Sequence, residues 1–118
     1  IKFLGQIDNV ENYLKNSDVY VHSAINEPFG LVLIEAMASG LPVICIDGKG
    51  NRDIVKQGYN GFIVEQNSKV FSKKIIEVYE NKNLKKRLSN NSILYSKQFS
   101  LEKYIKNLMK IYNYNSWI

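Results

Sequence analysis

The sequence has very few of the residues that bind metals or form disulfides. It contains one cysteine and one histidine among 118 residues. Cys45 alone excludes a disulfide within this chain, and its place in the apolar run PVICI predicts a buried thiol. The single histidine and the scattered acids form no cluster with metal-ligand spacing. We therefore predict no metal site and no bound cofactor.

Long hydrophobic runs are missing as well. The longest apolar stretch is broken at Glu35 and again between Ser39 and Pro42, so nothing reaches the roughly 18 residues that a transmembrane helix needs. No signal peptide is visible at the start, and we expect a cytoplasmic protein. The chain opens on IKFLG without an initiator methionine, which indicates a piece of a longer protein. Its length corresponds to one domain or part of one.

Acidic residues are scarce in the C-terminal part. Residues 68–118 carry eleven Lys/Arg and three Asp/Glu, a net charge of +8, whereas residues 1–67 have a net charge of −3. One interpretation is that basic amphipathic helices within residues 69–110 lie peripherally on the inner face of an anionic membrane. The other is a solvated outer face, with the apolar stripes packed on a sheet. Nucleic-acid binding is disfavoured, because the chain has only two arginines and no recognisable module.

Alternating strand and helix patterns predict an α/β fold. This spacing is typical of a Rossmann-like parallel sheet with flanking helices and right-handed crossovers. The expected strands are one within residues 2–7 that ends at Gly5, then 18–24, 42–46 and 60–65, with helices at 9–17, 31–39 and 51–58. The rest is expected to be helical, with three apolar stripes: Val70, Phe71, Ile75, Val78 and Tyr79; Leu84, Leu88 and Tyr95; and Leu101, Ile105, Leu108 and Ile111.

Three predicted loops meet at one edge of this sheet, because ligands of parallel sheets bind beyond the carboxyl ends of the strands. The loops are residues 5–8, 23–30 and 47–51. The most informative is the loop-to-helix junction EPFGLVLIE. Gly30 lets a ligand approach the backbone closely, and the amides of Leu31 and Val32 begin a helix without intrahelical acceptors. Such amides, together with the helix dipole, form an anion site that suits a phosphate.

Two carboxylates flank this junction. Glu35 stands in an otherwise apolar run, for which we expect burial, and a buried carboxylate is costly unless something binds it. It lies about 7–8 Å along the helix axis from the turn, about the reach from a pyrophosphate to a ribose. Glu27, before the turn, would face a transferred group. The alternative is that Glu35 accepts a hydrogen bond from the backbone or a lysine and that Glu27 is a solvated loop acid.

The same window resembles the C-terminal, donor-binding domain of family-4 retaining glycosyltransferases of the GT-B architecture. Weaker similarity runs from FLGQI to the last helix. By this resemblance, residues 1–118 are a nucleotide-sugar-binding fragment, the truncated C-terminal half of such an enzyme. The N-terminal acceptor domain is absent from this chain, as are an Arg and a Lys that neutralise the diphosphate. The family signature E-x-F-G-x-x-x-x-E-A-x-A-x-G-x-P-V is matched at Glu27, Phe29, Gly30, Glu35, Ala36, Ala38, Gly40, Pro42 and Val43.

The resemblance implies roles for individual residues. Glu27 corresponds to the catalytic-site glutamate that contacts the donor sugar and the charge developing near its anomeric carbon. Glu35 corresponds to the glutamate that binds the ribose hydroxyls. The other implied donor-binding residues are Phe29, Gly30 and Leu31, whose amides hold sugar hydroxyls and the diphosphate, Val32 against the ribose, and Gly5, Gln6 and Ile7 around the nucleobase.

The implied activity is transfer of a sugar from a nucleoside-diphosphate-sugar to a hydroxyl of a carbohydrate or lipid-linked acceptor. The transfer retains the anomeric configuration and needs no metal ion, and the fragment alone is expected to be inactive. Abundant Lys, Asn, Ile and Tyr hint at an AT-rich bacterial genome and at surface polysaccharide or glycoconjugate synthesis. The competing interpretations are a basic membrane-binding module and a nucleotide-sugar epimerase or sugar phosphorylase on the same scaffold. The EPFG and EAMASG motifs disfavour the latter pair.

Overall fold

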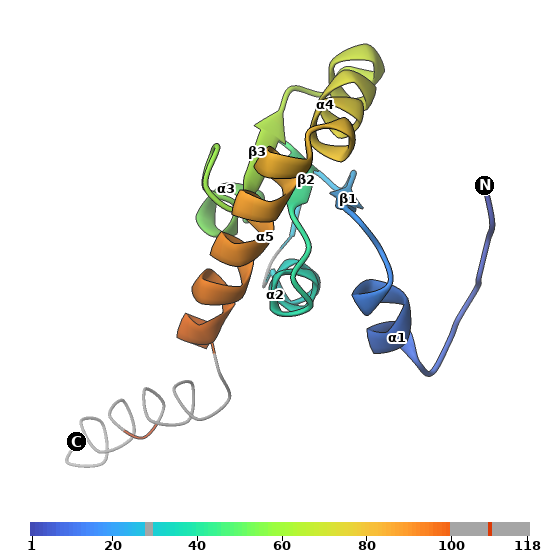
Figure 1. The fold of residues 1–118 in the computed structure, drawn as a ribbon, viewed down its shortest axis with the longest axis vertical. Helices are drawn as coiled ribbons and strands as arrows, with labels where there is room; N and C mark the ends of the chain where they lie inside the picture. Colours follow the sequence, from blue (N-terminus) through green and yellow to red (C-terminus); the bar gives the residue numbers. More distant parts are fainter. Residues whose placement is uncertain (28–29, 100–108, 110–118) are drawn as a thin grey trace.

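A parallel three-stranded sheet forms the centre of the molecule (Figure 1). The structure is a computed structural model that describes residues 1–27, 30–99 and 109. The strand order is β1 (Tyr20–His22), β2 (Val43–Ile46) and β3 (Gly61–Val64), with both neighbouring pairs parallel. This architecture confirms the predicted Rossmann-like α/β class.

The helices cover both faces of the sheet. Because side chains alternate along a strand, β2 sends Val43 and Cys45 into one apolar cluster with Leu33 and Met37, and Ile44 into a second cluster on the opposite face. All four residues of β2 are buried as a result. The helices are α1 (Val10–Lys15), α2 (Leu31–Ala38), α3 (Asn51–Ile54), α4 (Ser68–Glu80) and α5 (Lys82–Ser96), followed by a 3₁₀ turn, η1 (Lys97–Phe99).

The prediction of a strand at the N-terminus is wrong. Residues 1–7 form a coil that runs away from the sheet (Figure 1), and Phe3 is 93% exposed. The segment pairs with none of the three strands in the described part of the chain. An extended segment without a neighbour leaves its N–H and C=O groups without ladder hydrogen bonds, so a strand-like composition alone does not produce a strand.

The two described apolar stripes pack largely as predicted. Val78 of α4 and Leu88 of α5 are fully buried against Ile44 in the second cluster. Tyr79 is the exception, since it is 57% exposed. The third predicted stripe, within residues 101–111, lies outside the described residues. None of the described helices is both long and apolar enough to cross a membrane.

Candidate functional site

The loops that follow β1 and β2 lie side by side at the carboxyl edge of the sheet. Asn26 and Lys49 form a parallel bridge, and the Glu27 amide donates a hydrogen bond of 3.1 Å to the Lys49 carbonyl. Gly50, with φ of +88°, allows this close approach, because a Cβ there would collide with the Glu27 carbonyl oxygen. The sheet therefore brings together two of the three loops that the sequence assigned to this edge.

Asn51, at the start of α3, ties the two loops together. Its side chain is completely buried, and its Nδ2 donates to the carbonyls of Ala24 at 2.8 Å and Ile46 at 2.9 Å. Ala24 lies in the loop after β1 and Ile46 is the last residue of β2, so Asn51 ties the first loop to the strand end from which the second loop starts. Sequence reasoning missed this residue. Its only local signal is an asparagine directly after a glycine-rich turn.

Gly30 is the N-cap of α2 and holds the predicted turn. It is buried with φ of +67°, and a Cβ there would lie 2.7 Å from Cγ1 of Ile54 on α3. Its amide donates a hydrogen bond of 3.2 Å to Oε1 of Glu27. The amide that the sequence assigned to a ligand is thus occupied by a carboxylate of the same loop. Phe29, which precedes Gly30 in the sequence, lies outside the described residues.

Glu27 is not the solvated loop acid that one interpretation expected. Its side chain is 19% exposed, and its second oxygen, Oε2, lies 3.5 Å from Nε2 of His22 at the end of β1. The carboxylate therefore faces the backbone of the α2 N-terminus on one side and an imidazole on the other. A carboxylate at this position is also favoured by the positive end of the helix dipole.

Glu35 is exposed, so the expectation that it is buried is wrong. Although nearly every residue of α2 is apolar, only one side of the helix packs on the core, through Leu33, Ala36 and Met37. Leu31 and Val32, the first residues of α2, share the uncovered side and are 64% and 38% exposed. Within the described residues, no hydrogen bond or ion pair engages the Glu35 carboxylate, so the alternative of a backbone or lysine partner finds no support there.

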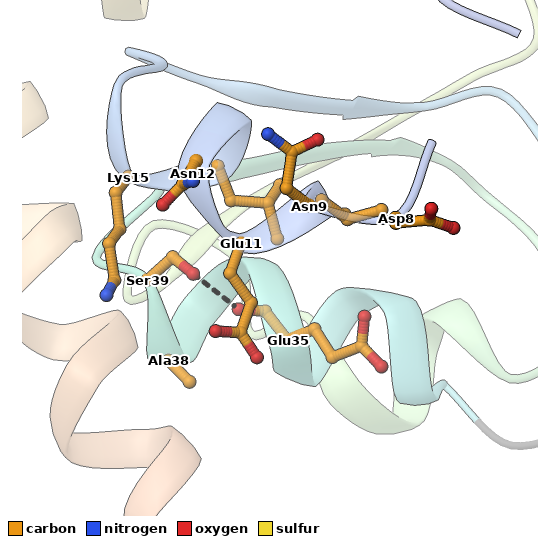
Figure 2. Close-up of a pocket in the computed structure, with 10 residues that line it drawn as sticks. Asp8, Asn9, Glu11, Asn12, Lys15, Glu35, Ala38 and Ser39 are labelled. Atoms are coloured by element: carbon orange, nitrogen blue, oxygen red, sulfur yellow. Dashed lines mark hydrogen bonds between the residues drawn. The ribbon is translucent and has the colours of Figure 1, made fainter. Parts of the chain in front are cut away.

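The outer face of α2 and the segment around α1 enclose a pocket of about 690 Å³ (Figure 2). Three carboxylates line it, from Asp8, Glu11 and Glu35, against the single ammonium group of Lys15. This balance favours groups that donate hydrogen bonds, such as hydroxyls, and disfavours phosphate. A diphosphate is accordingly better placed at the Gly30 end of α2 than inside this pocket.

Tyr20 on β1 lies in the field of both glutamates. Burial raises the pKa of the Tyr20 phenol, and the negative charges of Glu27 and Glu35 raise the same pKa further. The two carboxylates that the sequence singled out thus act on one common side chain. Sequence reasoning missed Tyr20 because it reads as an ordinary strand residue.

Arg52 of α3, next to the second loop, already has a carboxylate partner. Arg52 donates a hydrogen bond to Asp47, which lowers the pKa of that carboxyl despite some opposing desolvation. Among the residues that the structure describes, no group of three His, Cys, Asp or Glu is arranged to hold a metal ion.

Gly5, Gln6 and Ile7 lie in the N-terminal coil and do not line the pocket, which begins at Asp8.

Comparisons with known proteins identify relatives of this chain along most of its length. The family described as glycosyl transferases group 1 matches residues 1–95. An uncharacterized glycosyltransferase of Methanocaldococcus jannaschii is 36% identical over 115 residues, 95% of this chain but 33% of that protein. A UDP-Gal:alpha-D-GlcNAc-diphosphoundecaprenol alpha-1,3-galactosyltransferase of Escherichia coli is 39% identical over 64 residues, 54% of this chain and 16% of that protein.

Solved structures show the same fold. The crystal structure of HepE from Anabaena, in complex with UDP and glucose, superposes with a TM-score of 0.88 at 25% identity over 95% of this chain and 31% of that chain. This chain therefore spans about a third of the length of the Methanocaldococcus jannaschii and Anabaena proteins. With a family match over most of its residues, the chain belongs to the glycosyl transferases group 1 family.

Proposed function

We propose that this chain is the donor-binding part of a family-4, retaining GT-B glycosyltransferase that transfers a sugar from a nucleoside diphosphate to a hydroxyl. The observation that carries the proposal is the meeting of Glu27, the Gly30 amide and the start of α2 at the carboxyl edge of the sheet. The likeness to a structure that contains UDP and glucose supports the nature of the donor.

The α2 N-terminus supplies the chemistry of the leaving group. When the glycosidic bond to the diphosphate breaks, negative charge grows on the departing phosphate oxygen, and the amides of Leu31 and Val32 stabilise that charge together with the Gly30 amide, which exchanges its hydrogen bond to Glu27 for one to the donor. By the family resemblance, the Phe29 amide belongs to the same set. Glu27 then binds the sugar and stabilises the positive charge near the anomeric carbon. In this proposal no metal ion takes part, since the N-terminus of α2 stabilises the negative charge of the leaving diphosphate in its place.

Glu35 binds the two ribose hydroxyls from the α1–α2 pocket. It stands about 7–8 Å along the axis of α2 from Gly30, and no described group competes for its carboxylate. Val32 lies on the same uncovered side and packs against the ribose. Gly5, Gln6 and Ile7 frame the nucleobase once the rest of the sheet is present, because a strand needs a neighbour.

The remaining machinery belongs to the longer protein. We assign to it the acceptor domain and the Arg/Lys pair that neutralises the diphosphate, so the chain alone is inactive. The acceptor is a carbohydrate or a lipid-linked sugar used in bacterial surface polysaccharide synthesis on the cytoplasmic side of the membrane. The name of the Escherichia coli relative, whose acceptor is linked to diphosphoundecaprenol, supports this class of acceptor.

Peripheral membrane contact through residues 69–110 is a second proposal that suits a lipid-linked acceptor. The outer face of α4 exposes Ile76 by 53% and Tyr79 by 57%, close to the exposed Lys69 and Lys73. Liposome co-sedimentation that rises with anionic lipid and falls with salt would support contact. Equal sedimentation with neutral liposomes, or none at all, would contradict it.

Two variants of the full-length protein test the enzymatic proposal. Glu27→Gln should abolish most turnover, and Glu35→Ala should weaken UDP binding by about tenfold or more, as expected for lost hydrogen bonds to a charged group. Isothermal titration with UDP, GDP and ADP measures the second effect and identifies the base. Glu80→Ala, on α4 and away from the pocket, is the matched control. Unchanged turnover of Glu27→Gln, or equal affinities of the two alanine variants, would contradict the proposal.

Product analysis separates the transferase from an epimerase or a phosphorylase on the same scaffold. A transferase releases the nucleoside diphosphate only when an acceptor is glycosylated. An epimerase leaves the nucleotide-sugar bond intact, and a phosphorylase consumes or forms a sugar phosphate. The anomeric configuration of the product tests retention.

A further inference from the structure

We infer that His22 is a positioning residue that orients the Glu27 carboxylate for the donor sugar. The inference rests on the proposed function, because it assigns Glu27 its role. His22 is the last residue of β1, and its register partner on β2 is Cys45, so the strand end delivers its ring to the carboxyl edge. It is also the only histidine of the chain.

One nitrogen of the His22 imidazole has no hydrogen-bond partner among the residues that the structure describes. Nε2 of His22 is buried and makes no hydrogen bond with any described residue, while its side chain is only 11% exposed. A buried polar atom without a partner is uncommon and costs free energy. Oε2 of Glu27 lies 3.5 Å from this nitrogen. A shift of about 0.5 Å would bring the two atoms to ordinary hydrogen-bond distance.

The two oxygens of Glu27 have different partners. Oε1 accepts the hydrogen bond from the Gly30 amide, and Oε2 faces His22. In the proposed function, the donor takes the Gly30 amide for itself. Glu27 then loses the partner of Oε1, and the N–H of His22 is the group left to orient the carboxylate. His22 therefore matters most when the donor is bound.

The ring itself is held in place by its neighbour. Tyr20 stacks on His22, with ring centroids 6.1 Å apart and an interplanar angle of 22°. A purely structural histidine would need only this stacking. A positioning histidine needs the Nε2 proton as well, because a carboxylate can accept a hydrogen bond and cannot donate one at neutral pH. This difference separates the two roles experimentally.

Substitutions at position 22 of the full-length protein test the inference. His22→Phe keeps a ring that can stack on Tyr20 and removes the N–H, whereas His22→Gln carries an N–H near the place of Nε2. We expect His22→Phe to lower kcat about 10-fold or more with little change in KM for the donor, and His22→Gln to restore most of kcat. His22→Met, which also lacks the donor, replaces the Phe variant if that variant does not fold.

A double-mutant cycle supplies the decisive readout. If His22 acts only through Glu27, then His22→Phe lowers kcat in the wild-type background and has no further effect in the Glu27→Gln background. If the reductions in kcat of the two single variants multiply in the double variant, or if His22→Phe and His22→Met keep wild-type kcat, the role of His22 is overturned. The proposed function would not be affected by either result. Wild-type turnover of Glu27→Gln itself would overturn the proposed function and, with it, this inference.

Discussion

Replacing Asn51 with alanine should destabilise the protein and loosen the donor site at once. The substitution removes the hydrogen bonds that Nδ2 donates to the carbonyls of Ala24, in the loop after β1, and Ile46, the last residue of β2. Each carbonyl left without a partner costs about 1–2 kcal/mol, while removal of the unpartnered buried Oδ1 returns about 1 kcal/mol. The net loss of unfolding free energy is therefore about 1–3 kcal/mol.

Urea unfolding measures the stability part. With a denaturant slope of about 1–1.5 kcal/mol per molar for a protein of this size, the midpoint should fall by about 0.7–3 M. Asn60→Ala is the matched control, since Asn60 is also completely buried, donates to Ile54 O at 3.2 Å and accepts from the Lys56 amide at 2.8 Å. We expect a similar loss of stability there.

Donor binding separates the two asparagines. Asn60 precedes β3 at the amino end of the sheet, so only Asn51→Ala should weaken UDP binding, by about tenfold, through the displaced Glu27 loop. A loss of unfolding free energy well below about 1 kcal/mol in Asn51→Ala would refute the hydrogen-bond reasoning. Equal UDP affinities of the two variants would refute the link between Asn51 and the site.

Two further predictions concern a buried thiol and a glycine. Burial and nearby Asp47 raise the pKa of Cys45 to about 12, whereas the unfolded thiol ionises from about pH 8.5. As pH rises, the thiol therefore loses its proton first in the unfolded state, and the free energy of unfolding should fall above about pH 8.5 by up to about 1.4 kcal/mol per pH unit. Urea unfolding at several pH values should show that Cys45→Ala lacks this contribution to the pH dependence. Identical pH dependences of the wild type and Cys45→Ala would contradict it. Gly30→Ala should cost more than Gly58→Ala, because both glycines have positive φ but only a Cβ at Gly30 would press on Ile54, at 2.7 Å. Gly58→Ala should lower the free energy of unfolding by about 1 kcal/mol, from the backbone alone. Equal unfolding midpoints of the two variants would contradict the predicted clash with Ile54.

Local sequence patterns predicted a helix, strand or turn correctly where the residues of that element determine its structure. The apolar run at 42–46 became the buried central strand β2, and the helix closed by Gly40 became α2. The glycine turn before α2 also lies at the carboxyl edge, as the parallel topology required. These features depend on residue type, spacing and chain direction, which the sequence contains directly.

The two predictions that were wrong, the N-terminal strand and the burial of Glu35, share one physical cause. In both cases the outcome depends on what packs beside the segment. Residues 2–7 have the composition of a strand, yet a strand forms only beside another strand. Glu35 was expected to be buried because α2 is apolar on almost every side, but apolar residues do not guarantee that something covers them. Leu31, 64% exposed, shows the same effect.

Contacts between distant residues were not predictable from the sequence. The hydrogen bond from Asn51 to Ala24 joins residues 27 positions apart. The approach of His22 to Glu27 depends on the path of the β1–α2 loop, which no local spacing encodes. Tyr20 belongs to the same group, since only the folded chain places its phenol near both glutamates.

The central claim is that the donor binds where the loop of Glu27 meets the start of α2. Titration of the ¹⁵N-labelled protein with UDP, followed by amide chemical shifts, tests it most directly. We predict that the largest shifts belong to Gly30, Leu31, Val32 and Glu35. The contradicting result would be shifts centred instead on Lys82, Lys85 and Lys86, which line a basic hollow beside Gly40.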